Sequence, residues 1–187
     1  SLSCDKNASD NLATNTSPWA AGGELNTIDT LLYDTVKQGY AESDPTTTNW
    51  ENSKNLLGGG KVATMWLGSW AVSQMQAAAA KAGGAASDIG FMPFPAQVGG
   101  KYCAIAGPDY LQAVSIHSAH KEAARAWLDW YTDKYTYAQD QGDVPTLKTA
   151  TMPADLQEYS DKGVQLMELS QTKTATVNAI DDAAEIG

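Results

Sequence analysis

The sequence predicts an α/β fold, and three observations support that class. Segments whose apolar residues recur every three or four positions, as in amphipathic helices, alternate with short apolar runs typical of buried strands. Glycine-rich turns separate most of these segments. The chain has 187 residues, 43% of them hydrophobic, so it can bury a core as one domain or as two small lobes. Alternating strands and helices favour a sheet covered by helices.

The helical segments have recognisable start and stop signals. The first 23 residues are polar, with proline and glycine breakers, and are expected to be extended or loop. Asn49 is a candidate N-cap, because its side chain can accept a hydrogen bond from the first turn of a helix. Gly68, Ser69 and Trp70 form a turn that opens a further helix. Helices are predicted over residues 25–38, 49–57, 70–81, 121–134 and 156–167.

Shorter segments have the composition of strands. Residues 61–67 form a nearly continuous apolar run that includes Val62, Met65 and Trp66, as expected of a strand covered on both faces. A loop is expected over residues 142–145. Further strands are predicted over residues 88–91, 102–105 and 111–116.

The charge of the chain excludes some classes of partner. The formal net charge is −10, from 22 acidic and 12 basic residues, and no cluster of Lys or Arg interrupts the acidic excess. A nucleic acid backbone and an anionic membrane surface would both be repelled. No apolar run approaches the roughly 20 residues that span a bilayer. We therefore expect no nucleic acid partner and no membrane span.

Cysteine, histidine and acidic residues form no recognised catalytic or metal-binding pattern. Cys4 and Cys103 allow at most one disulfide, include no C-x-x-C pair, and are expected to be unpaired. His117 and His120 have no further ligand at suitable spacing, so neither a metal nor a cofactor is expected. The sequence has no nucleophile elbow and no phosphate-binding glycine loop. The adjacent acids Asp181-Asp182 are expected to be solvated rather than a glycosidase pair.

The aromatic composition is unusual, with six Trp and eight Tyr against two Phe. An aromatic ring with a polar edge can stack on the apolar face of a sugar while its surroundings bind the hydroxyls. Trp70 is the first candidate for this role, because it opens a helix where free backbone N–H groups point outward. Trp19, between a proline and a glycine loop, is the second. The remaining tryptophans are expected in the core or at its edge: Trp50, Trp66, Trp127 and Trp130.

Successive motifs over residues 50–150 resemble landmarks of a known family. They are Gly60 to Met65 with Gly68 to Trp70, then Asp88 to Pro95, His120 to Leu128, and Gly142 to Pro145. In this order and spacing they resemble the extracellular solute-binding proteins of family 1. These are the sugar-binding subunits of ABC importers, related to the maltose-binding type.

The resemblance implies a fragment of a two-lobe, type II periplasmic-binding-protein-like fold with the ligand in a cleft between the lobes. The family is considerably longer than this chain, so most of the N-terminal lobe, the signal sequence and the C-terminal helices are expected to be missing. Residues 1–104 resemble the C-terminal lobe. Residues 105–172 resemble a hinge crossing with the late-returning part of the N-terminal lobe, and residues 173–187 a return crossing.

The resemblance also implies site residues. In the family, the tryptophan of the Gly-Ser-Trp turn commonly packs against a sugar ring, which indicates Trp70 with Ser69 and Gly68 beside it. Asp109 lies where the inter-lobe strand often lines the cleft, and its carboxylate is suited to accept hydrogen bonds from sugar hydroxyls. Trp19 would stack from the other side.

The function implied by the resemblance is binding and delivery, not catalysis. Such a protein closes two lobes on a sugar or oligosaccharide, and a membrane permease recognises the closed form. It works outside the cytoplasm, with lipid anchoring of the full-length protein left open, and the fragment is expected to bind weakly and to be prone to self-association. The alternatives are a carbohydrate-active enzyme fragment, a lectin-like module, or a solute-binding protein for a non-sugar ligand.

Overall fold

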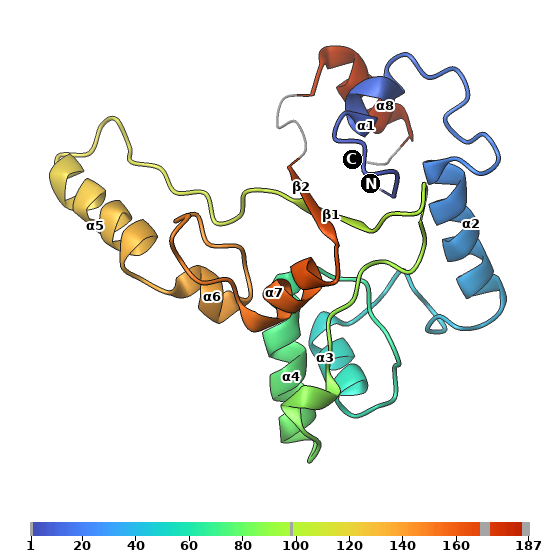
Figure 1. The fold of residues 1–187 in the computed structure, drawn as a ribbon, viewed down its shortest axis with the longest axis horizontal. Coiled ribbons are helices and arrows are strands. Elements are labelled where there is room, and N and C mark those ends of the chain that lie inside the picture. Colours follow the sequence, from blue (N-terminus) through green and yellow to red (C-terminus); the bar gives the residue numbers. More distant parts are fainter. Residues whose placement is uncertain (1, 98, 169–172, 185–187) are drawn as a thin grey trace. The chain divides into compact units, whose positions relative to one another are not determined.

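The computed structural model describes residues 2–97, 99–168 and 173–184 (Figure 1). The chain divides into two compact units, and each is described by itself. The first unit comprises residues 1–48, 92–107 and 163–187, and the second comprises residues 49–91 and 108–162. None of the described helices is long and apolar enough to cross a bilayer.

The first unit combines helices with a small parallel sheet (Figure 1). Strand β1 pairs in parallel with β2, with Cys103 opposite Gln165, and helices α1 and α8 contact each other. Its buried apolar side chains are Leu2, Val164 and Val177. The elements are α1 (Ala8–Leu12), α2 (Glu24–Lys37), β1 (Cys103–Ala106), β2 (Gln165–Glu168) and α8 (Ala175–Ala184).

Two predictions that fall in the first unit are confirmed, and two that concern its segments are corrected. The predicted helix from residue 25 and the strand at residues 102–105 are present as α2 and β1. The first 23 residues also contain α1, which polar composition did not reveal. The last predicted helix stops early, because Gly163 adopts a left-handed φ of 81° and the following residues pair with β1 as β2.

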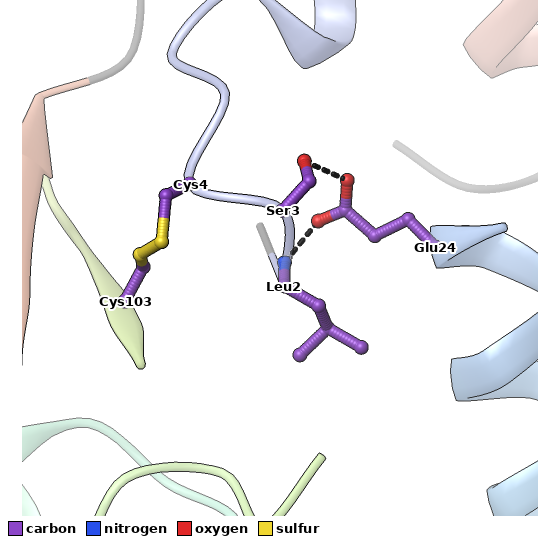
Figure 2. Close-up of a disulfide and its surroundings, with 5 residues drawn as sticks. All are labelled: Leu2, Ser3, Cys4, Glu24 and Cys103. Atoms are coloured by element: carbon purple, nitrogen blue, oxygen red, sulfur yellow. Dashed lines mark hydrogen bonds between the residues drawn. A yellow bond between two sulfur atoms is a disulfide. The ribbon is translucent and has the colours of Figure 1, made fainter. Parts of the chain in front are cut away.

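Cys4 and Cys103 form a disulfide across a sequence separation of 99 residues, so the prediction of unpaired cysteines is wrong (Figure 2). Their Cα atoms lie 5.5 Å apart, within the range that a disulfide spans. Beside this bond, the Glu24 carboxylate accepts hydrogen bonds from the Leu2 backbone N–H and the Ser3 hydroxyl. The N-terminal segment is therefore fixed at both α2 and β1, a long-range contact that local sequence patterns do not encode.

The second unit is built from helices (Figure 1). Helices α3 and α4 pack closely, since a Cβ atom on Gly58 would lie 2.6 Å from the Ala78 backbone. The predicted cap at Asn49 is confirmed, because its side chain accepts a 2.9 Å hydrogen bond from the Asn52 N–H. The elements are α3 (Trp50–Gly58), the 3-10 turn η1 (Ser69–Ala71), α4 (Val72–Lys81), η2 (Ala86–Asp88), α5 (Lys121–Asp133), α6 (Tyr137–Gln141) and α7 (Ala154–Asp161).

The core of the second unit lies along α4 and α7. Met75 and Ala79 are 2% and 1% exposed, and Leu156 and Tyr159 of α7 are 4% exposed. The Tyr159 ring stacks on Phe91 at a centroid distance of 4.9 Å, and burial raises the pKa of its hydroxyl. The buried residues of each helix lie three or four positions apart, as expected of one helix face.

Three predicted strands are wrong. Residues 61–67, 88–91 and 111–116 form no strand, and in the described chain the sheet consists of β1 and β2. A strand forms only where a neighbour pairs with its backbone groups, so an apolar run without such a neighbour stays irregular. Leu111 and Ile116 accordingly remain 81% and 76% exposed.

The predicted burial of three tryptophans is also wrong. Trp66 is 62% exposed, Trp127 is 53% exposed and Trp130 is 45% exposed. The two on α5 lie on the apolar face that the sequence predicts, but no element of the described structure covers that face fully. Their helical spacing is as predicted, but no residue of α5 is buried by the described part of the chain.

Candidate functional site

The turn at Gly68 positions the first predicted site residue. A Cβ atom on Gly68 would lie 2.5 Å from Trp70 Nε1, so the indole ring folds back over the glycine and would have to shift if a larger residue stood there. The half-buried Trp70 ring also contacts Trp50, with centroids 5.5 Å apart and planes tilted by 58°. The Trp70 ring therefore contacts both the turn and α3, and the predicted turn is present as η1, which leads directly into α4.

A cavity of about 210 Å³ lies beside this turn, within the second unit. Three elements line it: η1 with the first turns of α4, the end of α6, and the start of α7. Its lining combines hydroxyl, amide and carboxylate groups with the apolar side chains of Val72, Pro153, Ala154 and Leu156. The polar lining side chains are Ser69, Ser73, Gln76, Gln139, Asp140 and Asp155.

Close backbone approach at Gly142 closes one side of the cavity. Gly142 has a left-handed φ of 78° and caps α6, and a Cβ atom there would lie 3.0 Å from the Ser69 carbonyl oxygen. Both the conformation and the approach favour glycine at this position. The Gly142 motif and the Gly68 turn, far apart in sequence, therefore meet at one wall.

Opposite walls of the cavity are linked by an amide. Gln76 Nε2 lies 3.4 Å from Asp155 Oδ2 and 3.4 Å from the Ile89 carbonyl oxygen. An amide carries donors and an acceptor, whereas a carboxylate only accepts. Because both N–H groups of Gln76 are engaged in this way, the pair offers acceptor oxygens to a ligand that has hydroxyls.

An acidic and aromatic cluster follows directly after Gly142. Burial raises the pKa of the Asp143 carboxyl, and the negative charge of Asp109 adds to that rise. A side-chain hydrogen bond between Tyr110 and Tyr137 raises the pKa of Tyr137. The rings of these two tyrosines meet edge to face, with centroids 5.1 Å apart. Burial also raises the pKa of Tyr131, next to Tyr137. Asp109 and Asp143 therefore lie in one electrostatic neighbourhood.

Asp109 itself shapes this cluster. The Oδ1 atom of Asp109 accepts a 2.8 Å hydrogen bond from the backbone N–H of Tyr110. Tyr110 has a φ of 49°, which is unusual for a residue other than glycine. Such backbone conformations persist where surrounding contacts enforce them, and they often occur at binding sites. The exposed Asp109 side chain is thus partly engaged in holding Tyr110.

The predicted site residues do not all meet. Ser69 lines the cavity, and Gly68 and Trp70 lie beside it, although Trp70 is not among the described lining residues. Asp109 belongs to the neighbouring cluster. Trp19 lies in the first unit, is 46% exposed, and donates a 2.7 Å hydrogen bond from Nε1 to Asp29.

Sequence reasoning missed several polar groups of the site. Ser73 and Gln76 lie four and seven residues after the predicted Ser69, so helical periodicity could have placed them on the same face. Gln139 and Asp155 come from elements that meet α4 only in the folded chain, and Tyr110 gave no local signal.

Other candidate centres receive no support as metal sites. Within the described residues, no group of three or more His, Cys, Asp or Glu side chains is placed to hold a metal ion. His117 and His120 are both exposed. Asp181 is 8% exposed and forms a 2.6 Å ion pair with Lys173, so the expectation that it is solvated is wrong, whereas Asp182 is exposed.

The fold and the polar cavity define a class of protein, a fragment of a type II periplasmic-binding-protein-like fold, as predicted. The sequence profile described as bacterial extracellular solute-binding protein matches residues 4–138. The chain belongs to this family. No curated protein sequence matches it.

Solved structures of sugar-binding proteins resemble the whole chain. One is a manno-oligosaccharide-specific solute-binding protein of Bifidobacterium animalis subsp. lactis with mannotriose, at 30% identity and a TM-score of 0.81. Another is a binding protein of an ABC transporter from the same organism. Its complex with mannobiose matches at 29% identity and a TM-score of 0.79, and its complex with mannotriose matches at 30% identity and a TM-score of 0.75. Each match covers 100% of this chain and 44–45% of the other. The chain therefore spans less than half the length of these relatives.

Proposed function

We propose that the chain is part of the substrate-binding component of an ABC importer, and that its ligand is a sugar or oligosaccharide. The observation that best supports this is the match of the whole chain, at about 30% identity, to proteins solved with mannobiose and mannotriose. Manno-oligosaccharides are therefore the first ligands to test. The proteins to which the chain is similar bind and deliver rather than catalyse, and we propose the same of this chain.

We propose a ligand site centred on Trp70, Ser69 and Gly68. The cavity beside this turn supports the proposal, because its amides, hydroxyls and carboxylates suit a ligand rich in hydroxyls. The tilted Trp70 ring would supply the apolar contact for one sugar face. Asp109 would accept hydrogen bonds with the oxygen that Tyr110 does not engage. Trp19 remains a separate candidate for stacking on a sugar.

We further propose the division of the chain between the two lobes of the full-length protein. Residues 1–104 would belong to the C-terminal lobe, residues 105–172 to a hinge crossing and the returning N-terminal part, and residues 173–187 to a return crossing. Ligand would then favour a closed arrangement of the lobes, which the membrane permease recognises. This assignment is distinct from the two compact units of the structure, which are defined by contacts.

The proposed location is outside the cytoplasm. The Cys4–Cys103 disulfide supports it, because such bonds persist mainly in oxidising compartments. The net charge of −10 favours a small neutral solute over nucleic acid or phosphate-rich partners. A lipid anchor, if present, would require a cysteine other than Cys4, whose sulfur is bonded to Cys103.

Tryptophan fluorescence of the protein at the length of its relatives tests the proposal. Mannobiose and mannotriose should give saturable changes, and inorganic phosphate should give none. Trp70→Phe should weaken binding by about tenfold or more, since it removes the indole N–H and part of the ring area that would contact the sugar. Trp66→Phe, at an exposed tryptophan outside the cavity, is the matched control.

Two outcomes would contradict different parts of the proposal. If no sugar of a broad panel changes the fluorescence or the melting temperature, the sugar ligand is wrong and the non-sugar alternative stands. If Trp70→Phe and the control behave alike while sugar still binds, the site lies elsewhere.

A further inference from the structure

The wall of the cavity beside the Gly68 turn carries negative charge without a matching positive charge. Asp140 and Asp155 both line it, and the described lining includes no Lys, Arg or His side chain. Aspartates are normally ionised near pH 7. Between described side chains, no ion pair includes either aspartate. The cavity is therefore an anionic environment for the ligand that it binds.

Asp155 is the aspartate better placed to act on a ligand. Its side chain is partly buried, whereas Asp140 is exposed, and an exposed charge is screened more strongly by water and salt. Asp155 stands in the first turn of α7, where the helix dipole favours a negative charge. Its Oδ2 atom lies 3.4 Å from Gln76 Nε2. Within the described chain Oδ1 accepts no hydrogen bond, so it can receive one from a ligand hydroxyl.

The donors of the wall suit hydroxyls better than a carboxylate. The N–H groups of Gln76 are directed to Asp155 and to the Ile89 carbonyl oxygen, so this amide presents its own oxygen to the cavity. The hydroxyls of Ser69 and Ser73 can each donate or accept, but they carry no charge. The wall therefore has acceptors and neutral donors, and no charged donor that would compensate a ligand carboxylate.

Cations elsewhere in the second unit are engaged on their own helices. Three of them pair with an acid three or four residues away, which holds their positive charge beside that acid. Asp143, which directly follows the lining residue Gly142, adds further negative charge near the cavity. The three pairs are Lys54–Glu51, Arg125–Glu122 and Lys162–Glu158.

We infer that the cavity selects saccharides by charge and that Asp155 determines this specificity. It admits a neutral saccharide, because sugar hydroxyls donate to its carboxylates. It rejects a uronic acid, which has a carboxylate where the neutral sugar has a hydroxymethyl group, because two like charges would meet in a partly buried site. The inference rests on the proposed function, since it takes this cavity as the sugar site.

A divalent cation is the alternative occupant of such a wall. Within the described residues, no third His, Cys, Asp or Glu joins Asp140 and Asp155 in a group placed to hold a metal ion. Calcium in proteins is usually held by six to eight oxygen ligands, several of them from carboxylates. The two occupants predict opposite behaviour, because a bound cation would attract the carboxylate of an acidic sugar that the aspartates repel.

Isothermal titration calorimetry of the protein at the length of its relatives tests the inference at pH 7. Three disaccharides differ at one group of each ring: mannobiose, dimannuronate, and the uncharged primary amide of dimannuronate. Mannobiose should bind at least about thirtyfold more tightly than dimannuronate, as expected of like charges several ångströms apart in a partly buried site. The amide should bind within about fivefold of mannobiose, and about 0.5 M sodium chloride should narrow the gap to dimannuronate.

Substitution at the two ends of α7 tests the role of Asp155. Asp155→Asn removes one charge and keeps the shape of the side chain, so the preference for mannobiose over dimannuronate should fall by about tenfold. Asp161→Asn is the matched control, because it makes the same change in net charge at an exposed position at the other end of the helix. It should change the preference by no more than about twofold.

Several results would overturn the inference. Equal binding of mannobiose and dimannuronate would mean that the cavity does not sense charge. Rejection of the amide would make the selection steric, and equal effects of Asp155→Asn and Asp161→Asn would assign it to the charge of the whole chain. Dimannuronate binding that calcium strengthens would assign the wall to a metal ion. Each of these results leaves the proposed function in place, whereas binding of none of the saccharides would overturn both.

Discussion

The two compact units of the chain are held together in different ways. The first is closed by the Cys4–Cys103 disulfide and a short parallel strand pair, and few apolar side chains are buried in it. The second contains no cysteine and is held by helix packing, with Met75 and Ala79 of α4 almost fully buried. A small core gains most from a covalent crosslink, whereas packed helices supply their own stability.

The largest expected effect is therefore confined to the first unit. Cys103→Ser, or reduction with dithiothreitol, should lower the free energy of unfolding of this unit by about 3–5 kcal/mol, because the open chain regains the conformational entropy of a long loop. The lower end of that range applies if the second unit stays folded, since part of the closed loop is then already ordered.

Hydrogen exchange resolved by mass spectrometry measures this effect unit by unit. Amides of β1 and β2 should lose protection, while amides of α4 should keep it. Equal loss in both units would show that they unfold together, and the contrast between them would then be wrong. Cys4→Ser is the matched variant and should behave like Cys103→Ser, because either removes the same bond.

Truncation of a core side chain in the second unit should have the opposite effect on amide exchange in the two units. Met75→Ala should destabilise the second unit by about 2–5 kcal/mol, because the side chain is 2% exposed and its loss leaves a cavity. Amides of α3, α4 and α7 should exchange faster, and those of β1 should not. Met92→Ala, at a methionine that is 58% exposed, should have little effect. A comparable loss for both variants would contradict the core described along α4.

The same contrast explains how far the sequence predicted the fold. Helices with local signals, such as the Asn49 cap and the periodic stripes of α4 and α5, were predicted nearly to their ends. The disulfide and β2 depend on partners distant in sequence, and local patterns did not predict them. Residues 61–67 have strand composition without a pairing neighbour in the described chain, so composition alone was misleading.

The candidate site shows the same limit. The Gly68-Ser69-Trp70 turn was recognisable because glycine and tryptophan at a helix start are locally distinctive. The meeting of Ser69 with Gly142, and of Gln76 with Asp155, is a property of tertiary packing. The turn of the candidate site was therefore predictable, but the polar side chains that join it in the folded chain were not.

The smallest predicted effect concerns Asp143 and its pH dependence. Burial, with the charge of Asp109, raises the pKa of this carboxyl above its usual value of 3.8, so the folded chain binds the proton more tightly than the unfolded chain. Its contribution to stability is then greatest below pH 3.8 and is lost as the pH rises through the folded-state pKa. Ionised Asp143 is consequently a cost to the second unit near neutral pH.

Asp143→Asn removes that cost. The variant should be more stable than the wild type at pH 7, by less than about 1 kcal/mol because the group is only partly buried, and the gain should vanish as the pH falls below 3.8. Urea denaturation of the two proteins across this pH range measures the difference. A gain that persists at low pH would mean that the substitution acts through packing, and that the electrostatic neighbourhood of Asp109 and Asp143 does not shape the stability of the second unit.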